Sequence, residues 1–220
     1  MSANLSNWHF FYMIKSIRFI LKKIYPNFIW ELPNDEKKIY LTFDDGPIPE
    51  VTEWVLNELQ NYNAKATFFC IGDNIQKHPN VFIKILEGDH AIGNHTFNHL
   101  NGWKTKLKEY VANVDVCKKQ LETNLCQTNL FRPPYGKIKL AQAKEITQLG
   151  YKIVMWDIIS KDYDKNTNKE TCVDNVLNAI KPGSIIVMHD SVKAFSNLEY
   201  ALPILLKKLT EKGFVFEKLS

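Results

Sequence analysis

Strand-like and helix-like stretches alternate through most of this 220-residue chain, and this alternation constrains the fold more than any other feature. The sequence predicts strands at 39–43, 66–71, 90–93, 130–132, 151–157, 184–189 and 214–216. It predicts helices between them at 50–61, 74–87, 106–122, 139–149, 169–180 and 198–211. Repeated strand–helix units indicate a parallel sheet with helical crossovers, either closed into a barrel or open and doubly wound.

Composition places the chain among ordinary globular proteins, with 45% hydrophobic and 24% charged residues. The formal net charge is only +4, and no basic run is interleaved with aromatic residues, so nucleic-acid binding is not expected. The four cysteines are scattered and form no C-x-x-C pair. They therefore predict neither a zinc knuckle nor a disulfide framework, and reduced thiols in a reducing compartment fit best.

Residues 1–33 are expected to form a basic amphipathic helical segment in front of a single domain at 34–220. Its apolar residues share one helical face, namely Met13, Ile14, Ile17, Leu21 and Ile24. Lys15, Arg18 and Lys22 lie on another face, which suits peripheral contact with an acidic membrane surface or packing against the end of a barrel. The segment makes a poor transmembrane span and lacks a clear signal-peptide cleavage site. A cytoplasmic or peripheral-membrane location is favoured, the cell envelope is the alternative, and the oligomeric state is not predicted.

Two adjacent carboxylates, Asp44 and Asp45, end the first expected strand directly before Gly46-Pro47. Each carboxylate disfavours ionisation of the other by electrostatic repulsion. A pair kept in this place suits cation binding or proton transfer, and the plainer alternative is a polar turn that caps the next helix. Cation binding or proton transfer is favoured over the capping turn because polar residues also follow three other expected strands.

The second polar group is a pair of histidines, His95 and His99, which at a spacing of four would lie on one face of a helical turn. Together with a carboxylate they would form a set of three metal ligands that leaves positions open for water and substrate. Arg132 precedes a stiff double proline and suits a carboxylate clamp, and the N–H of Tyr135 behind it suits an oxyanion. His189 ends a buried strand and suits a general acid. Taken singly, each of these groups has a structural alternative.

Together the four motifs resemble those of the polysaccharide deacetylases, the carbohydrate esterases that share the NodB homology domain. Thr42–Gly46 matches T-F-D-D-G, and His95–His99 matches H-[ST]-x-x-H. Arg132–Tyr135 matches R-x-P-Y, and Val187–His189 matches L-x-H. Four motifs in the family's order form a specific signal, whereas any one of them would be weak. The resemblance implies an α/β fold, an irregular (β/α) barrel with about seven strands whose site lies at the carboxyl ends of the strands.

The resemblance also implies a role for each matching residue. Asp45, His95 and His99 would hold one divalent metal ion, with zinc expected first and cobalt, nickel or manganese as alternatives. Asp44 would be the general base, paired with Arg132, and His189 the general acid, paired with Asp162. The remaining two assignments concern the substrate: the backbone N–H of Tyr135 would stabilise the oxyanion, and Val187 would line the pocket for the acetyl methyl.

The implied activity is removal of N-acetyl groups from glycans that contain N-acetylglucosamine, such as peptidoglycan or chitin-like oligosaccharides. Two alternatives stay open: hydrolysis of a non-sugar amide or cyclic imide on the same fold, and a non-catalytic glycan-binding relative. One family block, D-x-x-D-W, departs from the pattern because Ile159 stands at its first Asp. Asp157, two residues earlier, is a candidate substitute. Trp103 is placed either at the cleft rim, against a sugar ring, or in the core.

Overall fold

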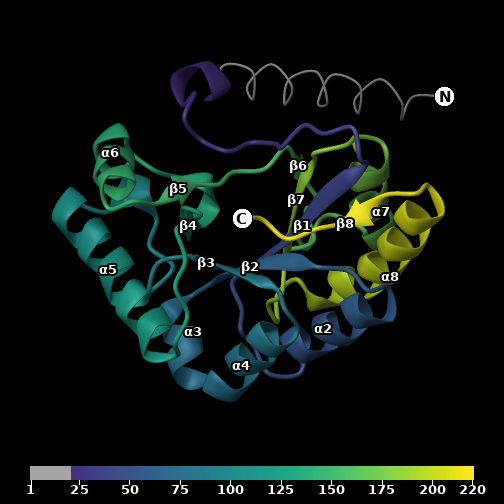
Figure 1. Cartoon of the computed structure of the whole chain (residues 1–220), viewed down its shortest axis with the longest axis horizontal. Coiled ribbons are helices and arrows are strands. Elements are labelled where there is room, and N and C mark those ends of the chain that lie inside the picture. The colour runs from purple at the N-terminus through teal and green to yellow at the C-terminus, as the bar shows by residue number, and fades with distance from the viewer. Residues whose placement is uncertain (1–20) are drawn as a thin grey trace.

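The computed structural model of the protein describes residues 21–220. Its centre is a curled sheet in which seven strands follow the order β5-β4-β3-β2-β1-β7-β6, with every neighbouring pair parallel (Figure 1). The short β8 pairs with the start of β1. This architecture confirms the predicted irregular barrel of about seven strands. The strands are β1 (Lys38–Asp44), β2 (Ala66–Cys70), β3 (Ala91–Asn94), β4 (Leu130–Phe131), β5 (Lys152–Ile153), β6 (Ile158–Ile159), β7 (Ile185–His189) and β8 (Val215–Phe216).

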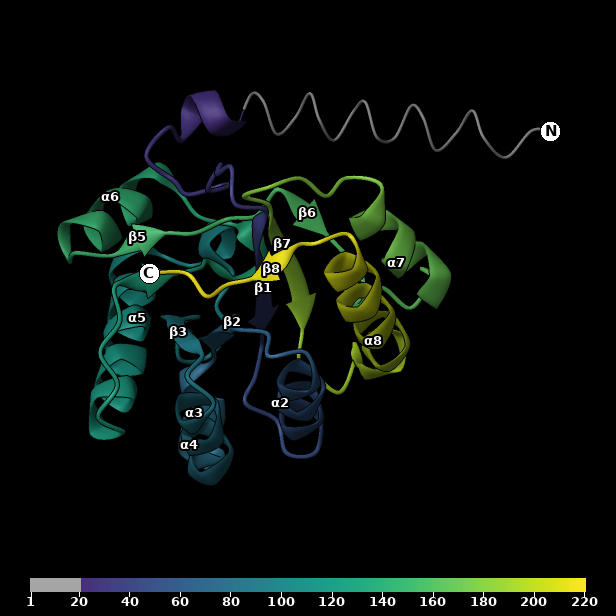
Figure 2. The same cartoon turned by 45° about the vertical axis from the view of Figure 1, so that its right-hand side comes forward.

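Helices cover the outer side of this sheet, as Figure 2 shows for α2, α3, α4, α5 and α8. Each turns one apolar stripe inward; on α8 the buried positions follow the three-to-four residue spacing of a helical face. Fully burying one such aliphatic side chain contributes roughly 1.5–3 kcal/mol. The helices are α2 (Val51–Asn61), α3 (Gly72–Lys77), α4 (Pro79–Glu87), α5 (Leu107–Thr123), α6 (Leu140–Gln148), α7 (Lys169–Leu177) and α8 (Phe195–Glu211).

The segment before β1 links β5, at one edge of the curled sheet, to the start of β7. Ile29 pairs in parallel with Val154, and its N–H donates to the carbonyl of Ile153 beside β5 (2.9 Å). Two residues later Glu31 pairs with Ser184, directly in front of β7. Residues 29–32, which the sequence analysis assigned to the N-terminal segment, therefore pack as part of the barrel. Most of the predicted amphipathic helix lies outside the described residues.

Two predicted elements are interrupted in the structure. The helix expected at 74–87 is two helices, because Pro79 starts α4 and disfavours helical backbone at His78, whose φ is −129°. The strand expected at 151–157 is regular only over Lys152–Ile153, followed by the single bridge of Val154 with Ile29. Beyond it the carbonyls of Val154 and Met155 turn to accept hydrogen bonds from a buried arginine instead of continuing a regular strand. Within residues 21–220 no helix is long and apolar enough to cross a membrane.

The loop that carries the two histidines also differs from its prediction, because residues 95–99 do not form a helical turn. Thr96 and His99 have positive φ angles of 64° and 54°. Side chains satisfy the backbone amides of this loop in place of helical hydrogen bonds. Asn94 Oδ1 accepts from Thr96 N (2.9 Å), and Asn113 Oδ1 accepts from Phe97 N (2.8 Å).

Candidate active site

The predicted site residues gather at the carboxyl ends of the strands, around a cleft of about 530 Å³. β1 supplies Asp44 and leads into Asp45, the loop after β3 supplies both histidines, and β7 supplies Val187 and His189. Adjacent parallel strands bring these positions together; Asp44, for example, lies in register with His189. Seven of the nine predicted residues line the cleft, and the other two, Arg132 and Asp162, are buried beside it.

Asp45, His95 and His99 form a group of three side chains that could hold a metal ion, and their potential ligand atoms all lie within 4.8 Å of one another. No other such group of His, Cys, Asp or Glu occurs within residues 21–220. Asp45 Oδ1 lies 3.1 Å from His99 Nε2 and 3.8 Å from His95 Nε2. Although buried, this oxygen has no well-aligned hydrogen-bond donor among the described residues. A buried carboxylate oxygen without a donor, facing two imidazole nitrogens, fits a divalent cation.

The protonation of His95 suits metal binding. Its Nδ1 lies 2.8 Å from the carbonyl oxygen of Arg132, which can only accept a hydrogen bond. Nδ1 therefore carries the proton, and the lone pair of Nε2 faces Asp45. Burial lowers the pKa of His95 to about 4, so the ring is neutral near pH 7. A backbone carbonyl that orients a ligating histidine in this way is a common feature of metal sites.

The backbone around Asp45 is held by its neighbours. Asp45 has a positive φ of 85°, and its carbonyl accepts a hydrogen bond from Asn74 Nδ2 (2.7 Å). The next amide, Gly46 N–H, donates to the buried carboxylate of Asp190 (3.0 Å), which also accepts from Thr52 Oγ1 (2.6 Å). The sequence analysis assigned no role to Asn74 or Asp190. The only sequence signal for Asp190 was its position directly after His189, the expected general acid.

Arg132 and Asp44 form a buried ion pair. Arg132 Nη1 donates to Asp44 Oδ1 (2.7 Å) and to Thr42 Oγ1 (2.6 Å). The other guanidinium nitrogens donate to the carbonyls of Val154 (3.3 Å) and Met155 (2.9 Å), and the guanidinium lies 4.1 Å from the ring centroid of Phe69. Arg132 is fully buried and held in one orientation. The pair leaves Oδ2 of Asp44 on the side of Asp45 and the two histidines, 4.0 Å from His95 Nε2.

His189, at the end of β7 and in register with Asp44, is paired with Asp162. Asp162 Oδ1 lies 2.8 Å from His189 Nδ1, and Asp162 Oδ2 accepts from the backbone N–H of His189 (2.7 Å). Burial alone would lower the pKa of His189. The charge of Asp162 and its hydrogen bond, with smaller contributions from the charges of Asp44 and Asp45, outweigh burial and raise this pKa to about 9. The imidazolium therefore holds its proton at neutral pH, and Nε2 is the nitrogen left for a substrate.

Asp157 does not substitute for a carboxylate at position 159. Its Oδ1 accepts from Ile185 N (2.6 Å) and its Oδ2 from Ser184 Oγ (2.9 Å). Both partners lie at the start of β7, whereas His189 ends that strand. Asp157 therefore supports the entry of β7, and Ile159 itself lines the cleft.

Tyr135 and Val187 shape the cleft wall and floor. The Tyr135 ring lies 4.5 Å from the ring of His99, and the residue has a positive φ of 60°. Val187 is almost completely buried and pairs with Thr42 on one side and Ile159 on the other. Trp103 lies at the surface, with 59% of its area exposed, and not in the core. The cleft is also lined by Lys137 and other residues that the sequence analysis did not single out, namely Trp156, Tyr163, Ser191 and Lys193.

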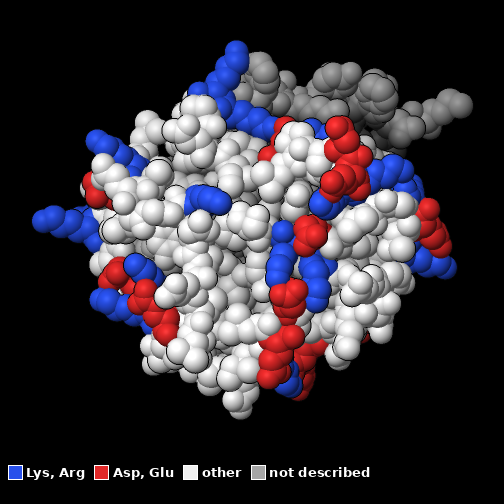
Figure 3. Space-filling view, viewed as in Figure 1, with Lys and Arg blue, Asp and Glu red and all other residues white. Residues whose placement is uncertain are grey.

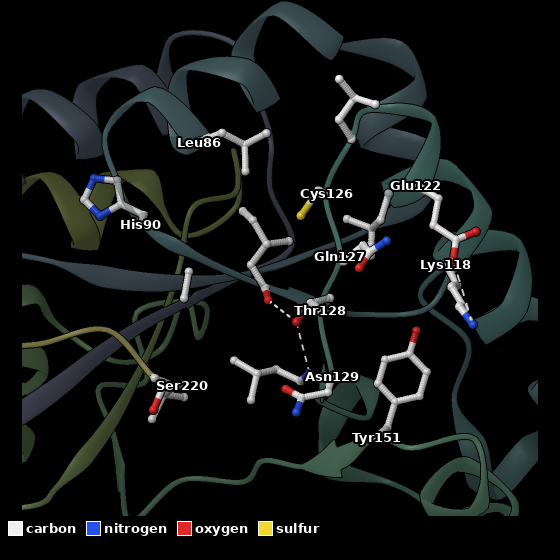
Figure 4. A pocket seen from close by; sticks show the side chains of 16 residues that line it. Leu86, His90, Lys118, Glu122, Cys126, Gln127, Thr128, Asn129, Tyr151 and Ser220 are labelled. Atoms are coloured by element: carbon white, nitrogen blue, oxygen red, sulfur yellow. Dashed lines mark hydrogen bonds and ion pairs between the residues drawn. The ribbon is translucent and has the colours of Figure 1, made fainter.

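A larger cavity of about 810 Å³ opens at the other end of the barrel, near the amino ends of β3 and β4 (Figure 4). Its polar groups are engaged structurally. His90 Nδ1 accepts from Ala66 N (3.2 Å), Tyr151 Oη accepts from Asn94 Nδ2 (3.1 Å), and Thr128 Oγ1 donates to Ile92 O (2.6 Å). Because the metal-binding group and the buried acid–base pairs lie elsewhere, the smaller cleft is the candidate active site.

Known proteins share both the sequence and the fold. The sequence profile described as "Polysaccharide deacetylase" matches residues 31–154. A peptidoglycan-N-acetylglucosamine deacetylase of Bacillus cereus is 38% identical over 192 residues, which are 87% of this chain and 90% of that protein. A chitooligosaccharide deacetylase of Azorhizobium caulinodans is 33% identical, over 72% of this chain and 76% of that protein. A crystal structure of a peptidoglycan N-acetylglucosamine deacetylase matches with a TM-score of 0.82 and 33% identity, over 88% of this chain and 91% of that one. As its ordered motifs predict, the chain belongs to the polysaccharide deacetylase family.

Proposed function

We propose that this protein is a metal-dependent hydrolase that removes N-acetyl groups from glycans containing N-acetylglucosamine, of the peptidoglycan or chitin type. The observation that carries the proposal is the arrangement of three functions around one cleft. A group of three side chains that could hold a metal ion lies beside a carboxylate held by Arg132 and an imidazolium held by Asp162. Amide hydrolysis needs this combination, because a water must lose a proton and an amine must gain one. The relatives named above support the same substrate class.

Asp45, His95 and His99 would hold the metal ion, zinc being the first expectation for one carboxylate and two imidazoles. When bound there, the ion would supply Lewis acidity, which polarises an amide carbonyl and lowers the pKa of water. Asp44 Oδ1 is occupied by Arg132, so Oδ2 is the oxygen that takes the proton of the attacking water. His189 then donates its Nε2 proton to the departing sugar amine, while Nδ1 stays on Asp162.

The remaining groups would position the acetamide. Val187, at the floor of the cleft, would contact the acetyl methyl. The backbone N–H of Tyr135 would donate to the oxygen that becomes negatively charged in the transition state. Removing one such donor or acid from an enzyme typically lowers the rate by ~10²–10³. The full set of metal ligands, base and acid favours an enzyme over a non-catalytic glycan-binding protein.

Acetate release tests this proposal. Metal-stripped protein is assayed on chitin oligomers and on peptidoglycan fragments, with and without added zinc or cobalt. We expect metal-dependent release that Asp44→Asn lowers by ~10²–10³. Asp73→Asn is the matched control, since that carboxylate is paired only with Lys77 on the surface of α3. Metal binding without release from any glycan would favour a non-sugar amide or cyclic imide, and absence of metal binding would refute the proposal.

A further inference from the structure

Two lysines that the proposed mechanism does not use line the cleft, Lys137 and Lys193. Lys137 is half-buried, and its Nζ lies 5.3 Å from the ring centroid of Trp103. Lys193 is exposed in the segment after β7, and its Nζ lies 5.7 Å from the ring centroid of Tyr163. Each lysine is therefore placed over an aromatic ring, an arrangement in which the cation is attracted by the face of the ring.

The two lysines lie on opposite flanks of the reacting centre. Lys137 closely follows Tyr135, whose ring lies 4.5 Å from the metal-binding His99. Lys193 lies beside Tyr163, whose ring lies 4.9 Å from the proposed acid His189. A glycan chain that places one acetamide between His99 and His189 extends in both directions along the cleft. Its neighbouring sugars would therefore meet one lysine on each side.

The charge on these flanks is unbalanced. The only carboxylates among the residues that line the cleft are Asp44 and Asp45, which belong to the catalytic floor. Neither lysine makes an ion pair with a carboxylate within residues 21–220. Lysines elsewhere do, as in Lys218–Asp89, and Figure 3 shows cationic and acidic side chains interspersed on one face of the molecule. Unpaired cations at both ends of a cleft attract an anionic ligand.

Two exposed aromatic residues on the Lys137 flank suit a sugar ring. Trp103 and Tyr135 are both 59% exposed, although aromatic residues of this size normally bury most of their surface. The edge of Trp103 is anchored, because its Nε1 donates to the carbonyl of Ile138 (3.3 Å). One flank thus offers fixed apolar surface for the body of a sugar and, beside it, an ammonium group for an anion.

We propose that Lys137 and Lys193 are specificity-determining residues that select N-acetylated glycans bearing carboxylates over neutral glycans of the same length. The inference rests on the proposed deacetylase function and narrows its substrate class. The carboxylate has two chemical sources in such a glycan: an acid joined by an ether to the sugar, as in muramic acid, or an attached peptide. Both present the same anion to the lysines, so the substrates of the test must separate them.

The test compares kcat/KM for three N-acetylated tetrasaccharides. One is neutral chitotetraose, one carries free ether-linked carboxylates, and one carries those acids as amides to a short acidic peptide. The wild-type protein is compared with Lys137→Gln, Lys193→Gln and the double variant, and Lys144→Gln on the outer surface of α6 is the matched control. Lys137→Arg and Lys193→Arg keep the charge and should restore the preference. Repeating the series at high salt tests whether the preference for carboxylate-bearing glycans is electrostatic, because salt screens exposed charges.

For the wild-type protein we expect kcat/KM to be higher on a carboxylate-bearing glycan than on chitotetraose. Each glutamine variant should lower that ratio about twofold to fivefold, and the double variant about tenfold, chiefly through KM, as expected for charges at the rim of a site. The arm that responds, free acid or peptide, identifies the source of the anion. An equal loss on all three glycans, or an unchanged ratio, would overturn the inference.

Failure of this inference is distinguishable from failure of the proposed function. If the wild-type protein released acetate from no glycan, the function itself would be wrong. Binding of the three glycans to the metal-loaded protein, measured by calorimetry, would still report whether the lysines select carboxylates. A preference that is absent in binding and in turnover, from a protein that deacetylates chitotetraose, would refute the lysine subsites alone.

Discussion

Replacing Asp162 by Asn should disable the proposed acid while leaving the cleft in place. The side chains have nearly the same shape, but an amide carries no charge and offers one acceptor oxygen where the carboxylate offers two. In the protein both carboxylate oxygens are used, one by the ring and one by the backbone N–H of His189. Asp162→Asn therefore removes the charge that holds the imidazolium and one of two acceptors.

The expected effect follows from the raised pKa of His189. Without Asp162 the pKa should fall from about 9 toward the ordinary 6.5, because the largest contributions that oppose burial are lost and only the charges of Asp44 and Asp45 remain. A fall to 6.5 would lower the protonated fraction at a pH of about 7.5 from about 97% to about 9%, which alone lowers the rate roughly tenfold. A bound divalent ion lowers both values, so the difference between variant and wild type is the quantity to compare.

Asp162→Asn should lower the free energy of unfolding as well as the rate. A pKa raised on folding contributes stability that is fully present below the unfolded value of 6.5 and is lost as pH rises through about 9. The shift of the pKa corresponds to about 3 kcal/mol at pH 6, which Asp162→Asn should remove. Above a pH of about 10 the variant should be destabilised less, since wild-type His189 is then neutral too.

The assay is the pH dependence of kcat/KM for acetate release, with urea unfolding measured in parallel. We expect the alkaline limb of the rate profile to move down by about two pH units in Asp162→Asn. Asp164→Asn is the matched control, because that carboxylate accepts only from Asn166 and Thr167 in its own loop. An alkaline limb that stays in place would show that His189 does not act as an acid poised by Asp162.

Three further perturbations test other parts of the structure. Arg132→Met leaves Asp44 buried without its cation and should cost about 3–5 kcal/mol in urea unfolding; a cost below about 1 kcal/mol would contradict the buried pair. Gly46→Ala places a methyl group 2.0 Å from a carboxylate oxygen of Asp190, so either Asp190 or the turn that carries Asp45 must shift. Zinc affinity by calorimetry should fall, and an unchanged affinity would show that the turn adapts. Ile29→Pro removes the amide donor to β5 and should cost roughly 1–3 kcal/mol, whereas Ile29→Ala separates the loss of side-chain packing.

Much of the fold was predictable because buried parallel strands appear as short apolar runs between amphipathic helices. β1, β2 and β7 follow this rule, and all three were predicted to within two residues. The bridge made by Ile29 was not predictable, since its pairing depends on which strand lies at the edge of the curled sheet. The loop at 95–99 was misjudged for a related reason. Its backbone is satisfied by Asn113, a residue on α5 that local sequence cannot place beside it.

The residues of the site also divide into those that the sequence could place and those that it could not. Asp44, Asp45 and His189 lie at strand ends, so their convergence follows from the parallel sheet once the strands are recognised. Lys137 and Lys193 lie in loops, where spacing carries no information about distance to the reacting centre. The gathering of the site residues was therefore predictable from motifs at strand ends, whereas the charge at the rim of the cleft required coordinates.

The geometry of the site explains what Ile159 does in place of the first Asp of the family's D-x-x-D-W block. β6 places Ile159 beside Val187, so the side chain adds apolar surface to the cleft instead of a second carboxylate near His189. Asp157, the only nearby substitute suggested by the sequence, is committed to the start of β7. Among residues 21–220, Asp162 is therefore the one carboxylate that hydrogen-bonds to His189. A second bonded carboxylate would still support the imidazolium after loss of the first; with Asp162 alone in that role, Asp162→Asn should remove the largest part of the pKa shift.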